Sequence, residues 1–573
     1  MKYITILSLF ITSHLWAQST KISDDQLVIL AKVWGVMKYY HPAVSQGKVD
    51  WDKTLINTLE SPFKRTDNEI ITEWLEMADK TSFEILTPSK ATCDSITFRN
   101  FDSKWIEKSR LNTISKTRLL KLINQNQNIG TYYSNPTLKS IRLDSQKEKI
   151  YEGFSANVKL LELFRIWNAV TYFYPYKYLL DTHWDKVLKK YIPIFKNIQN
   201  EQDYKLAITL LAAEIQDTHT GLKDTHQYAV FGKLTAPFTI QIVDNGALIT
   251  GIKDEKIMQK ANIKVGDFIT KINGKKIHQI IAEKSKYYPA SNQSVQLREA
   301  YNYLFSGNEP AFTIEGTTED GKTFKTNVER MPRTFAEEWD KDGIPNYKLT
   351  YKGKSYDYLV WNADQNRLNP VFRLEDKAYV EFSSLRAGEI DSLMCSFQNT
   401  KGIVFDLRSY NDNGALLKVF DHLLSKPQFF GIKTQPEFDQ PGKFCFVDYI
   451  ITKEYKLIGK ENPDAYKGRV IVLINEYTQS AAELWAMIFK KVPNVIFVGS
   501  QTAGADGNMV SIKLTDGNAL YFSGLGIYYP DGTETQRIGI KPDIVVRPTL
   551  KSIRNKADLL LEKAFQLIDE QKK

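Results

Sequence analysis

The chain of 573 residues is long enough for three or four domains, each with a core of its own. Its content of 42% apolar and 25% charged residues is that of an ordinary globular protein. The net charge of +9 is spread over 76 basic and 67 acidic residues, without the dense Lys/Arg blocks of nucleic-acid-binding proteins. We therefore expect no nucleic-acid partner.

The first 17 residues form a secretory signal pattern, with a basic start and a largely apolar stretch that ends at Ala17. No later apolar run approaches the roughly 20 residues that cross a bilayer. We therefore expect an exported protein, periplasmic or secreted, without stable insertion in a membrane. Neither a metal nor a cofactor is expected, because the three cysteines lack the spacing of metal ligands: Cys93, Cys395 and Cys445.

The N-terminal part is predicted to be helical, because apolar residues recur at the spacing of one helix face. It contains an internal duplication, in which the pair Trp34 and Trp51 returns as Trp167 and Trp184. Aromatic pockets can hold ligands, but an aromatic stripe at helical period indicates a buried core face. We expect the duplicated tryptophans to be core residues.

Asp217-Thr218-His219 follows the second helical unit. Asp-Thr-His also occurs at 181–183 and 224–226, so the tripeptide alone predicts nothing, and a lone histidine is usually structural or solvated. His219 differs from the other two histidines because Thr-Gly follows it and because the helical pattern of the sequence ends soon after it. Short strands and turns then begin, with Asn273-Gly274 as a predicted tight hairpin turn.

Two β-branched runs, 469–475 and 495–499, flank an amphipathic segment of helical length. This pattern predicts a β-α-β unit of a buried parallel sheet. Ser480 falls where the first strand gives way to the helix. Unpaired backbone N–H groups at the start of a helix can stabilise an anion beside the hydroxyl, as acyl transfer requires. The alternative interpretation is that Ser480 only caps the helix.

Three ordered segments resemble motifs of the tail-specific, or C-terminal processing, serine peptidases: Gly402–Arg408 followed by Gly414, Thr478–Glu483, and Gly539–Ile544. The resemblance covers about residues 155–550, and Ala261–Gly274 resembles the core of a PDZ domain within it. It implies a multidomain α/β protein, with a helical N-terminal region, a small β-rich PDZ-like module and an α/β catalytic domain of the ClpP/crotonase-like type.

The resemblance also implies a division of the chain. In order, we expect a signal peptide (1–17), an N-terminal helical repeat domain (18–150), a helical segment with the His motif (151–230), a PDZ-like domain (231–332), a linker (333–370), a catalytic domain (371–550) and a C-terminal helix (551–573). The PDZ-like domain would capture an extended peptide as an added strand, or serve only as structure.

A serine hydroxyl needs a base within hydrogen-bond reach. In the larger branch of the resembled family the base is a lysine 25 residues after the serine, and this chain has Ala505 there. The chain instead resembles the core of the tricorn protease, which uses a serine, a histidine and a glutamate. That resemblance implies Ser480 as nucleophile, His219 as base and Glu534 as supporting carboxylate, with Asp506 as a rival to Glu534.

Thr218 could assist through its hydroxyl, and the backbone N–H groups of Ala481 and Gly414 would form the oxyanion hole. These assignments predict an exported serine peptidase that hydrolyses peptide bonds of peptide or polypeptide substrates through an acyl-enzyme. The alternative is a catalytically inactive protein on the same fold that binds a peptide or an apolar ligand.

Overall fold

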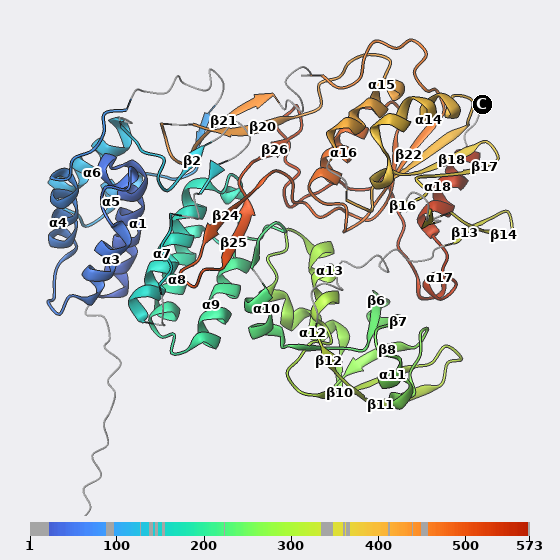
Figure 1. Ribbon diagram of the computed structural model, residues 1–573, viewed down its shortest axis with the longest axis horizontal. Coiled ribbons are helices and arrows are strands. Elements are labelled where there is room, and N and C mark those ends of the chain that lie inside the picture. The colour runs from blue at the N-terminus through green and yellow to red at the C-terminus, as the bar shows by residue number, and fades with distance from the viewer. Residues whose placement is uncertain are drawn as a thin grey trace, which may run out of the picture.

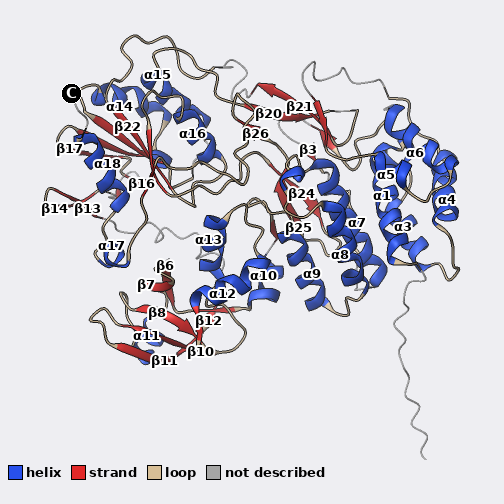
Figure 2. Ribbon diagram, turned by 180° about the vertical axis from the view of Figure 1, so that it is seen from behind, coloured by secondary structure: helices blue, strands red, loops and turns tan. Residues whose placement is uncertain are grey.

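The structure is a computed structural model (Figure 1) and describes residues 22–86, 97–125, 128–136, 141–143, 147–151, 155–222, 224–333, 348–358, 361–362, 367–410, 413–437, 439–448 and 457–570. The predicted signal segment and Cys93 lie outside these ranges. Figure 2 shows a mainly helical part at one end of the molecule and a part that combines helices and strands at the other. Within the ranges given above, no helix is both long enough and apolar enough to cross a membrane.

The duplication seen in the sequence is also a structural one. Helix α1 (Asp24–Tyr40) carries Trp34, and its counterpart α7 (Ala156–Phe173) carries Trp167. In the first copy the indole N–H of each tryptophan donates to the backbone carbonyl of the other, at 3.4 and 3.0 Å. The second copy repeats this reciprocal pair at 2.9 Å in both directions. Trp34 and Trp167 are 0% and 2% exposed, which confirms that they are core residues.

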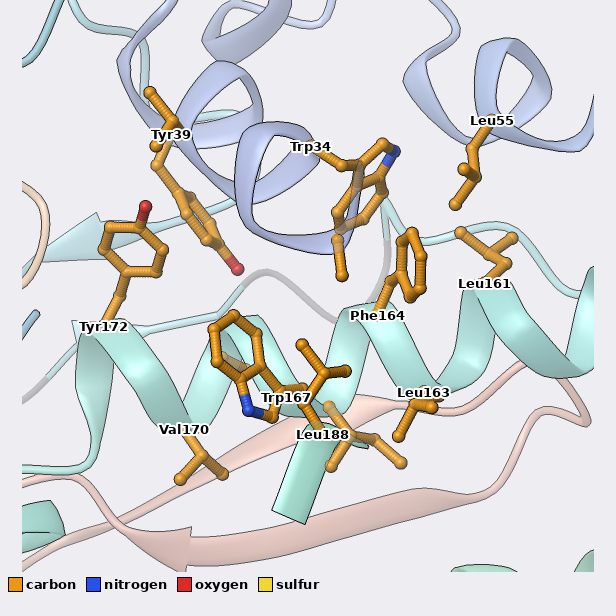
Figure 3. Close-up of a cluster of buried hydrophobic side chains, with 14 of the residues drawn as sticks. Trp34, Tyr39, Leu55, Leu161, Leu163, Phe164, Trp167, Val170, Tyr172 and Leu188 are labelled. Carbon is orange, nitrogen blue, oxygen red and sulfur yellow. The ribbon is translucent and has the colours of Figure 1, made fainter. Parts of the chain in front are cut away.

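The two copies pack against each other through equivalent residues (Figure 3). The side-chain amide of Asn168 donates to the carbonyls of Ala31 and Phe164, which occupy equivalent positions in the two copies, at 3.0 and 2.9 Å. Tyr39 also lies on its counterpart Tyr172, with ring centroids 4.9 Å apart. The repeat therefore behaves as a dimer within one chain, related by a pseudo-twofold axis.

The remaining elements of the helical part complete this core and lead to the His motif. They are α2 (Pro42–Ser45), α3 (Trp51–Glu60), α4 (Asp67–Asp79), β1 (Thr97–Arg99), α5 (Lys104–Lys108), α6 (Thr113–Gln125), β2 (Asn135–Pro136), β3 (Ile141–Arg142), α8 (Trp184–Lys196), α9 (Glu201–Ala213), β4 (Gly221–Leu222) and α10 (Asp224–Phe231).

A small module follows, built on the sheet β11-β10-β8-β7-β6 with β9 paired to β8. Asn273 and Gly274 join β8 to β9 as a two-residue turn, and both have positive φ, 49° and 77°, so the predicted hairpin turn is confirmed. The elements are β5 (Leu234–Thr235), β6 (Phe238–Val243), β7 (Gly246–Ile252), α11 (Glu255–Ala261), β8 (Phe268–Ile272), β9 (Lys275–Lys276), α12 (Ile277–Lys284), α13 (Gln293–Tyr303), β10 (Ala311–Thr317), β11 (Thr323–Glu329) and β12 (Met331–Pro332).

A second six-stranded sheet has the order β17-β18-β19-β22-β23-β27 and is parallel from β18 onward, as predicted. Helices α14 and α16 cover one face and α18 covers the other. The elements are β13 (Lys348–Tyr351), β14 (Lys354–Asp357), β15 (Trp361–Asn362), β16 (Arg367–Leu368), β17 (Val371–Leu374), β18 (Lys377–Glu381), α14 (Ile390–Phe397), β19 (Gly402–Asp406), α15 (Phe420–Leu423), β22 (Arg469–Ile474), α16 (Ala481–Phe489), β23 (Ile496–Gly499), β27 (Ile544–Val545), α17 (Leu550–Arg554) and α18 (Leu559–Asp569).

Two further sheets join distant parts of the chain. In the first, β1 from the helical part pairs with β21 (Lys443–Asp448), which pairs with β20 (Ile432–Pro436), and β20 pairs with β26 (Ile527–Tyr528). In the second, β24 (Met509–Lys513) pairs with β25 (Ala519–Ser523), and β25 pairs with β4, which begins two residues after His219. The His motif is therefore fixed to the domain that carries Ser480.

Candidate active site

Ser480 stands at the junction between β22 and α16, where the sequence pattern placed it. Its backbone has φ 57° and ψ −122°, a conformation that costs a non-glycine residue about 1–3 kcal/mol. Ser480 occupies the N-cap position of α16, but its side chain makes no capping hydrogen bond to the helix, so capping by the hydroxyl does not account for a serine here. The strained turn places Ser480 directly before Ala481, the first residue of α16.

Glu483, in the first turn of α16, holds the serine turn in place. This fully buried carboxylate accepts hydrogen bonds from the Thr502 hydroxyl and from the N–H groups of Gly504 and Ala505, the last two at 2.8 and 2.9 Å. The carbonyl of Ala505 in turn accepts from the N–H of Ser480 at 2.9 Å. Burial raises the pKa of Glu483. Sequence reasoning gave this residue no role, although it lies within the Ser480 motif.

His219 lies in a turn that is closed by the N–H of Thr220 donating to the carbonyl of Asp217 at 2.8 Å. The ring Nδ1 is 2.9 Å from the hydroxyl of Ser523 on β25. Burial lowers the pKa of His219, the charge of Asp217 opposes this shift, and the charge of Arg298 adds to it. Burial thus favours the neutral ring, which is the state that a base needs.

Asp217 connects the elements around the histidine. Its Oδ1 accepts from the N–H of His219 and from the side-chain amide of Gln536, both at 3.1 Å, and its Oδ2 accepts from the N–H of Ser523 at 2.6 Å. Sequence reasoning missed Ser523 and Gln536. No local motif marks either residue, because each meets His219 or Asp217 only in the folded chain, Ser523 from the end of β25 and Gln536 from a segment after β26.

The structure brings the His motif to the loop that holds Ser480. The Thr218 hydroxyl donates to the carbonyl of Ala503 at 3.3 Å, two residues before the Ala505 carbonyl that binds Ser480. Ser480 and His219 both belong to the described part of the chain, and no hydrogen bond joins the Ser480 hydroxyl to the His219 ring there. The two side chains thus come from adjoining segments and share no hydrogen bond in the described structure.

The two candidate carboxylates occupy different surroundings. Glu534 accepts a hydrogen bond from the Tyr178 hydroxyl at 2.9 Å and makes no hydrogen bond with His219. Asp506 is 3% exposed and accepts from the N–H of Gly507 at 2.7 Å. Burial, assisted by the charge of Glu483, raises the pKa of Asp506 well above its usual value.

The two predicted oxyanion donors come to the same end of the sheet. Ala481 is the first residue of α16, so its N–H has no carbonyl of the same helix to donate to. Gly414 opens the 3-10 helix Gly414–Val419, which follows the strand β19 next to β22. The Thr478 hydroxyl donates to the carbonyl of Leu407 at 2.9 Å and so joins the two strand ends. No cluster of metal ligands occurs in the described ranges.

The sequence is similar to one known protein family and to individual proteins of known type. The sequence model of Peptidase family S41 matches residues 376–546. A carboxy-terminal-processing protease of Bartonella bacilliformis is 27% identical over 327 residues, which is 56% of this chain and 62% of that protein. A tricorn-like protease C-terminal subunit of Sulfurisphaera tokodaii is 28% identical over 403 residues, 67% of this chain and 40% of that protein.

Solved structures agree with the fold. The chain matches mature CPAF complexed with lactacystin with a TM-score of 0.53 at 14% identity, over 73% of this chain and 99% of that one. A CPAF mutant matches with a TM-score of 0.57 at 13% identity, over the same shares. The chain spans less than two thirds of the two curated relatives named above, 62% and 40%. Residues 376–546 are thus a domain of Peptidase family S41 within this longer chain.

Proposed function

We propose that the protein is an exported serine peptidase that hydrolyses peptide bonds of polypeptide substrates through an acyl-enzyme. The observation that carries this proposal is the strained, uncapped Ser480 at the start of α16. A conformation that costs free energy persists when the surrounding structure imposes it, and such residues cluster at active sites. The buried Glu483 and the Ala505 carbonyl impose it here.

In the proposed reaction, the Ser480 oxygen forms a bond to the substrate carbonyl carbon and its proton passes to His219 Nε2. Nδ1 lies against the Ser523 hydroxyl, so Nε2 is the ring nitrogen that remains for this transfer. The N–H groups of Ala481 and Gly414 stabilise the oxyanion. The carbon–nitrogen bond then breaks, and the amine leaves with the proton from His219. Water releases the acyl group by the same steps.

For the carboxylate that supports His219, Glu534 remains our proposal from chain order. Its hydrogen bond with Tyr178 must be exchanged before it can reach the histidine. Asp217 is a second candidate, favoured by its contacts with the His219 N–H and with Ser523. Thr218 positions the His219 turn against the Ala503 carbonyl. Asp506 supports the Ser480 loop from its buried position in our proposal.

The predicted signal pattern supports export, and the small module of residues 231–332 supports a PDZ-like role in holding an extended polypeptide. A second function is favoured by one observation, the missing hydrogen bond between Ser480 and His219. On that basis the same site would bind a peptide or an apolar ligand without cleaving it.

A fluorophosphonate probe tests the proposal, because it reacts with an activated serine hydroxyl. The purified full-length protein should be labelled at Ser480, and Ser480→Ala should remove the label. Labelling of wild type that His219→Ala leaves at full rate would show that another group is the base. A folded wild-type protein that takes no label would favour the binding function.

A further inference from the structure

The turn between β22 and Ser480 is held in part by the α/β domain itself. The Asn475 N–H donates to the Thr478 hydroxyl at 3.1 Å, and that hydroxyl donates to the Leu407 carbonyl at 2.9 Å. The carbonyl of Thr478 accepts from the N–H of Ala503 at 3.0 Å. Thr478 is fully buried, so these hydrogen bonds fix the middle of the turn in a place shielded from water.

A second set of contacts to the same turn comes from the small module. Arg298 of α13 donates from Nη1 to the Glu476 carbonyl at 2.9 Å and to Oε1 of Gln479 at 3.0 Å. Gln479 directly precedes Ser480 in the chain. Because both hydrogen bonds come from one planar guanidinium group, they fix the two ends of the turn relative to each other. The small module thus contacts the residue next to the proposed nucleophile.

Arg298 is itself fixed in orientation. Its Nε and Nη2 both donate to Oε1 of Glu299, at 3.1 and 2.9 Å, and the guanidinium carbon lies 5.8 Å from the centre of the Tyr477 ring. The side chain is 12% exposed, so little water competes for these hydrogen bonds, which the charge of Arg298 strengthens. A guanidinium that is bound at both ends rotates little, so it holds the turn in one position.

The charge of Arg298 also acts on His219. Burial lowers the pKa of His219, the charge of Asp217 raises it, and the charge of Arg298 lowers it further. Asp217 belongs to the turn of His219 itself, and the contact of the ring on β25, Ser523, is an uncharged hydroxyl. Removing the Arg298 charge would raise the pKa of His219 and favour the imidazolium, which cannot accept the Ser480 proton.

We propose that Arg298 is a positioning residue for the proposed hydrolysis, which fixes the turn that leads to Ser480 and favours the neutral form of His219. This inference rests on the proposed function. It adds to that function a cation of the small module that acts on both nucleophile and base, on the first through hydrogen bonds and on the second through its charge. In this role Arg298 affects kcat and its pH dependence, whereas a residue that binds substrate affects KM.

Two substitutions separate the hydrogen bonds of Arg298 from its charge. Arg298→Lys keeps the charge but cannot reproduce the planar fork, and Arg298→Gln removes the charge as well. Both should lower the kcat of a short peptide about tenfold with little change in KM. Only Arg298→Gln should move the acid limb of kcat/KM to higher pH. The matched control is Arg118→Gln, which removes a guanidinium that pairs with Asp79 between α6 and α4 of the helical part.

Gln479→Ala tests the same contact from its other end, because it removes one acceptor and leaves the charge in place. It should lower kcat without moving the acid limb. The double variant Arg298→Lys with Gln479→Ala should lose less than the product of the two single losses, since both remove one interaction. Thermal unfolding shows that each variant is folded at the assay temperature. A wild-type kcat in both Arg298 variants would overturn the proposal, as would an effect confined to KM.

A measurement without catalysis separates this proposal from the proposed function. In the inactive Ser480→Ala protein, the titration of His219 is followed by NMR of isotope-labelled histidine, with His219→Ala to identify its signal. Arg298→Gln in that background should raise the pKa of His219. An unchanged titration would overturn the role of Arg298 toward the base, even if the wild type cleaves peptides. A raised pKa, together with a wild type that neither cleaves peptides nor takes the fluorophosphonate label, would overturn the proposed function and leave the effect of Arg298 on His219 standing.

Discussion

The backbone of Ser480 adopts a positive φ that side chains rarely tolerate, and the position follows a strand that is buried on both faces. A glycine would adopt this conformation without steric cost, yet the site holds a residue with a hydroxyl. The strain and the hydroxyl together imply that the residue is retained for its chemistry and at a cost in stability.

Ser480→Gly should therefore unfold at a higher temperature than Ser480→Ala. Glycine relieves the strain but loses more conformational entropy on folding, and the net gain should be about 1 kcal/mol. Both variants should fail to react with the fluorophosphonate probe. Thermal unfolding followed by circular dichroism measures the difference, and an alanine variant as stable as the glycine variant would show that the turn is unstrained.

The pH profile of cleavage should report His219. Its pKa is lowered below the usual 6.5 by burial, so the ring loses its ability to accept a proton only at a pH below that value. The acid limb of kcat/KM should lie below pH 6.5. His219→Ala should reduce turnover by about 10²-fold or more and abolish that limb. An acid limb that is unchanged in His219→Ala would assign it to another group.

Asp217 and Glu534 can be ranked by two isosteric substitutions. Asp217→Asn replaces an acceptor of three hydrogen bonds and should lower kcat strongly, on the order of 10²-fold, because the His219 turn and Ser523 lose their position. Glu534→Gln should have a smaller effect if Glu534 only bonds Tyr178. The comparison is made on kcat with KM measured alongside, and a larger loss for Glu534→Gln would identify it as the supporting carboxylate.

At the scale of elements, two equivalent ion pairs join the two copies of the duplicated helical unit. Lys32 of the first copy pairs with Asp185 of the second at 2.5 Å, and Arg165 of the second pairs with Asp52 of the first. Lys32 and Arg165 are equivalent positions, as are Asp52 and Asp185. The interface is thus self-complementary, as at a twofold axis between two identical subunits. The burial of the two pairs differs, however, with 5% exposure at Asp52 and 40% at Asp185.

Because the two ion pairs are equivalent in position but differ in burial, the exposed pair serves as the control for the buried pair. Asp52→Asn leaves the buried Arg165 without one of its charged partners and should lower the free energy of unfolding by about 3–5 kcal/mol. Asp185→Asn breaks a half-exposed pair and should cost about 0–1 kcal/mol. Urea unfolding followed by tryptophan fluorescence measures both. Equal losses would mean that burial does not decide the strength of these pairs.

At the scale of the whole molecule, the small module of residues 231–332 contributes hydrogen bonds to the candidate active site. The Ser291 hydroxyl accepts from the Thr218 N–H at 2.8 Å. The side-chain amide of Asn292 donates to the carbonyls of Thr502 and Ala503, at 2.9 and 3.1 Å. A module that only delivered substrate could be removed without harm to the cleavage of short peptides. Deleting residues 236–330 from this protein removes contacts of the site itself.

Asn292→Ala should therefore reduce the kcat/KM of a short peptide roughly tenfold, because three carbonyls of the site lose a donor. Asn292 also caps α13, so its loss weakens that helix. Asp254→Ala removes the equivalent cap of α11 in the same module, with no contact to the site, and serves as the control. Equal activity of the two variants would show that the module acts only as a binding unit.

The sequence by itself determined the parts that depend on local pattern. Strand runs of β-branched residues gave the parallel sheet, and two tryptophan pairs revealed the repeated helical unit. Asn273-Gly274 specified its hairpin turn, because few other residue pairs adopt positive φ twice in succession. Ser480 could be placed at a strand–helix junction because a β-branched run precedes it and an amphipathic segment of helical length follows it.

Only the tertiary structure decided how the site is assembled. The sequence does not encode the strain at Ser480, since φ there is imposed by Glu483 and the Ala505 carbonyl. Ser523 and Gln536 reach the His219 turn across more than 300 residues, and the pairing of β4 with β25 brings Ser523 there. Contacts of this kind follow from packing between elements, which hydrophobic period and turn chemistry do not specify. Chain order suggested Glu534 as the carboxylate that supports His219. Which carboxylate does so depends on distances between side chains, and these exist only in the folded chain.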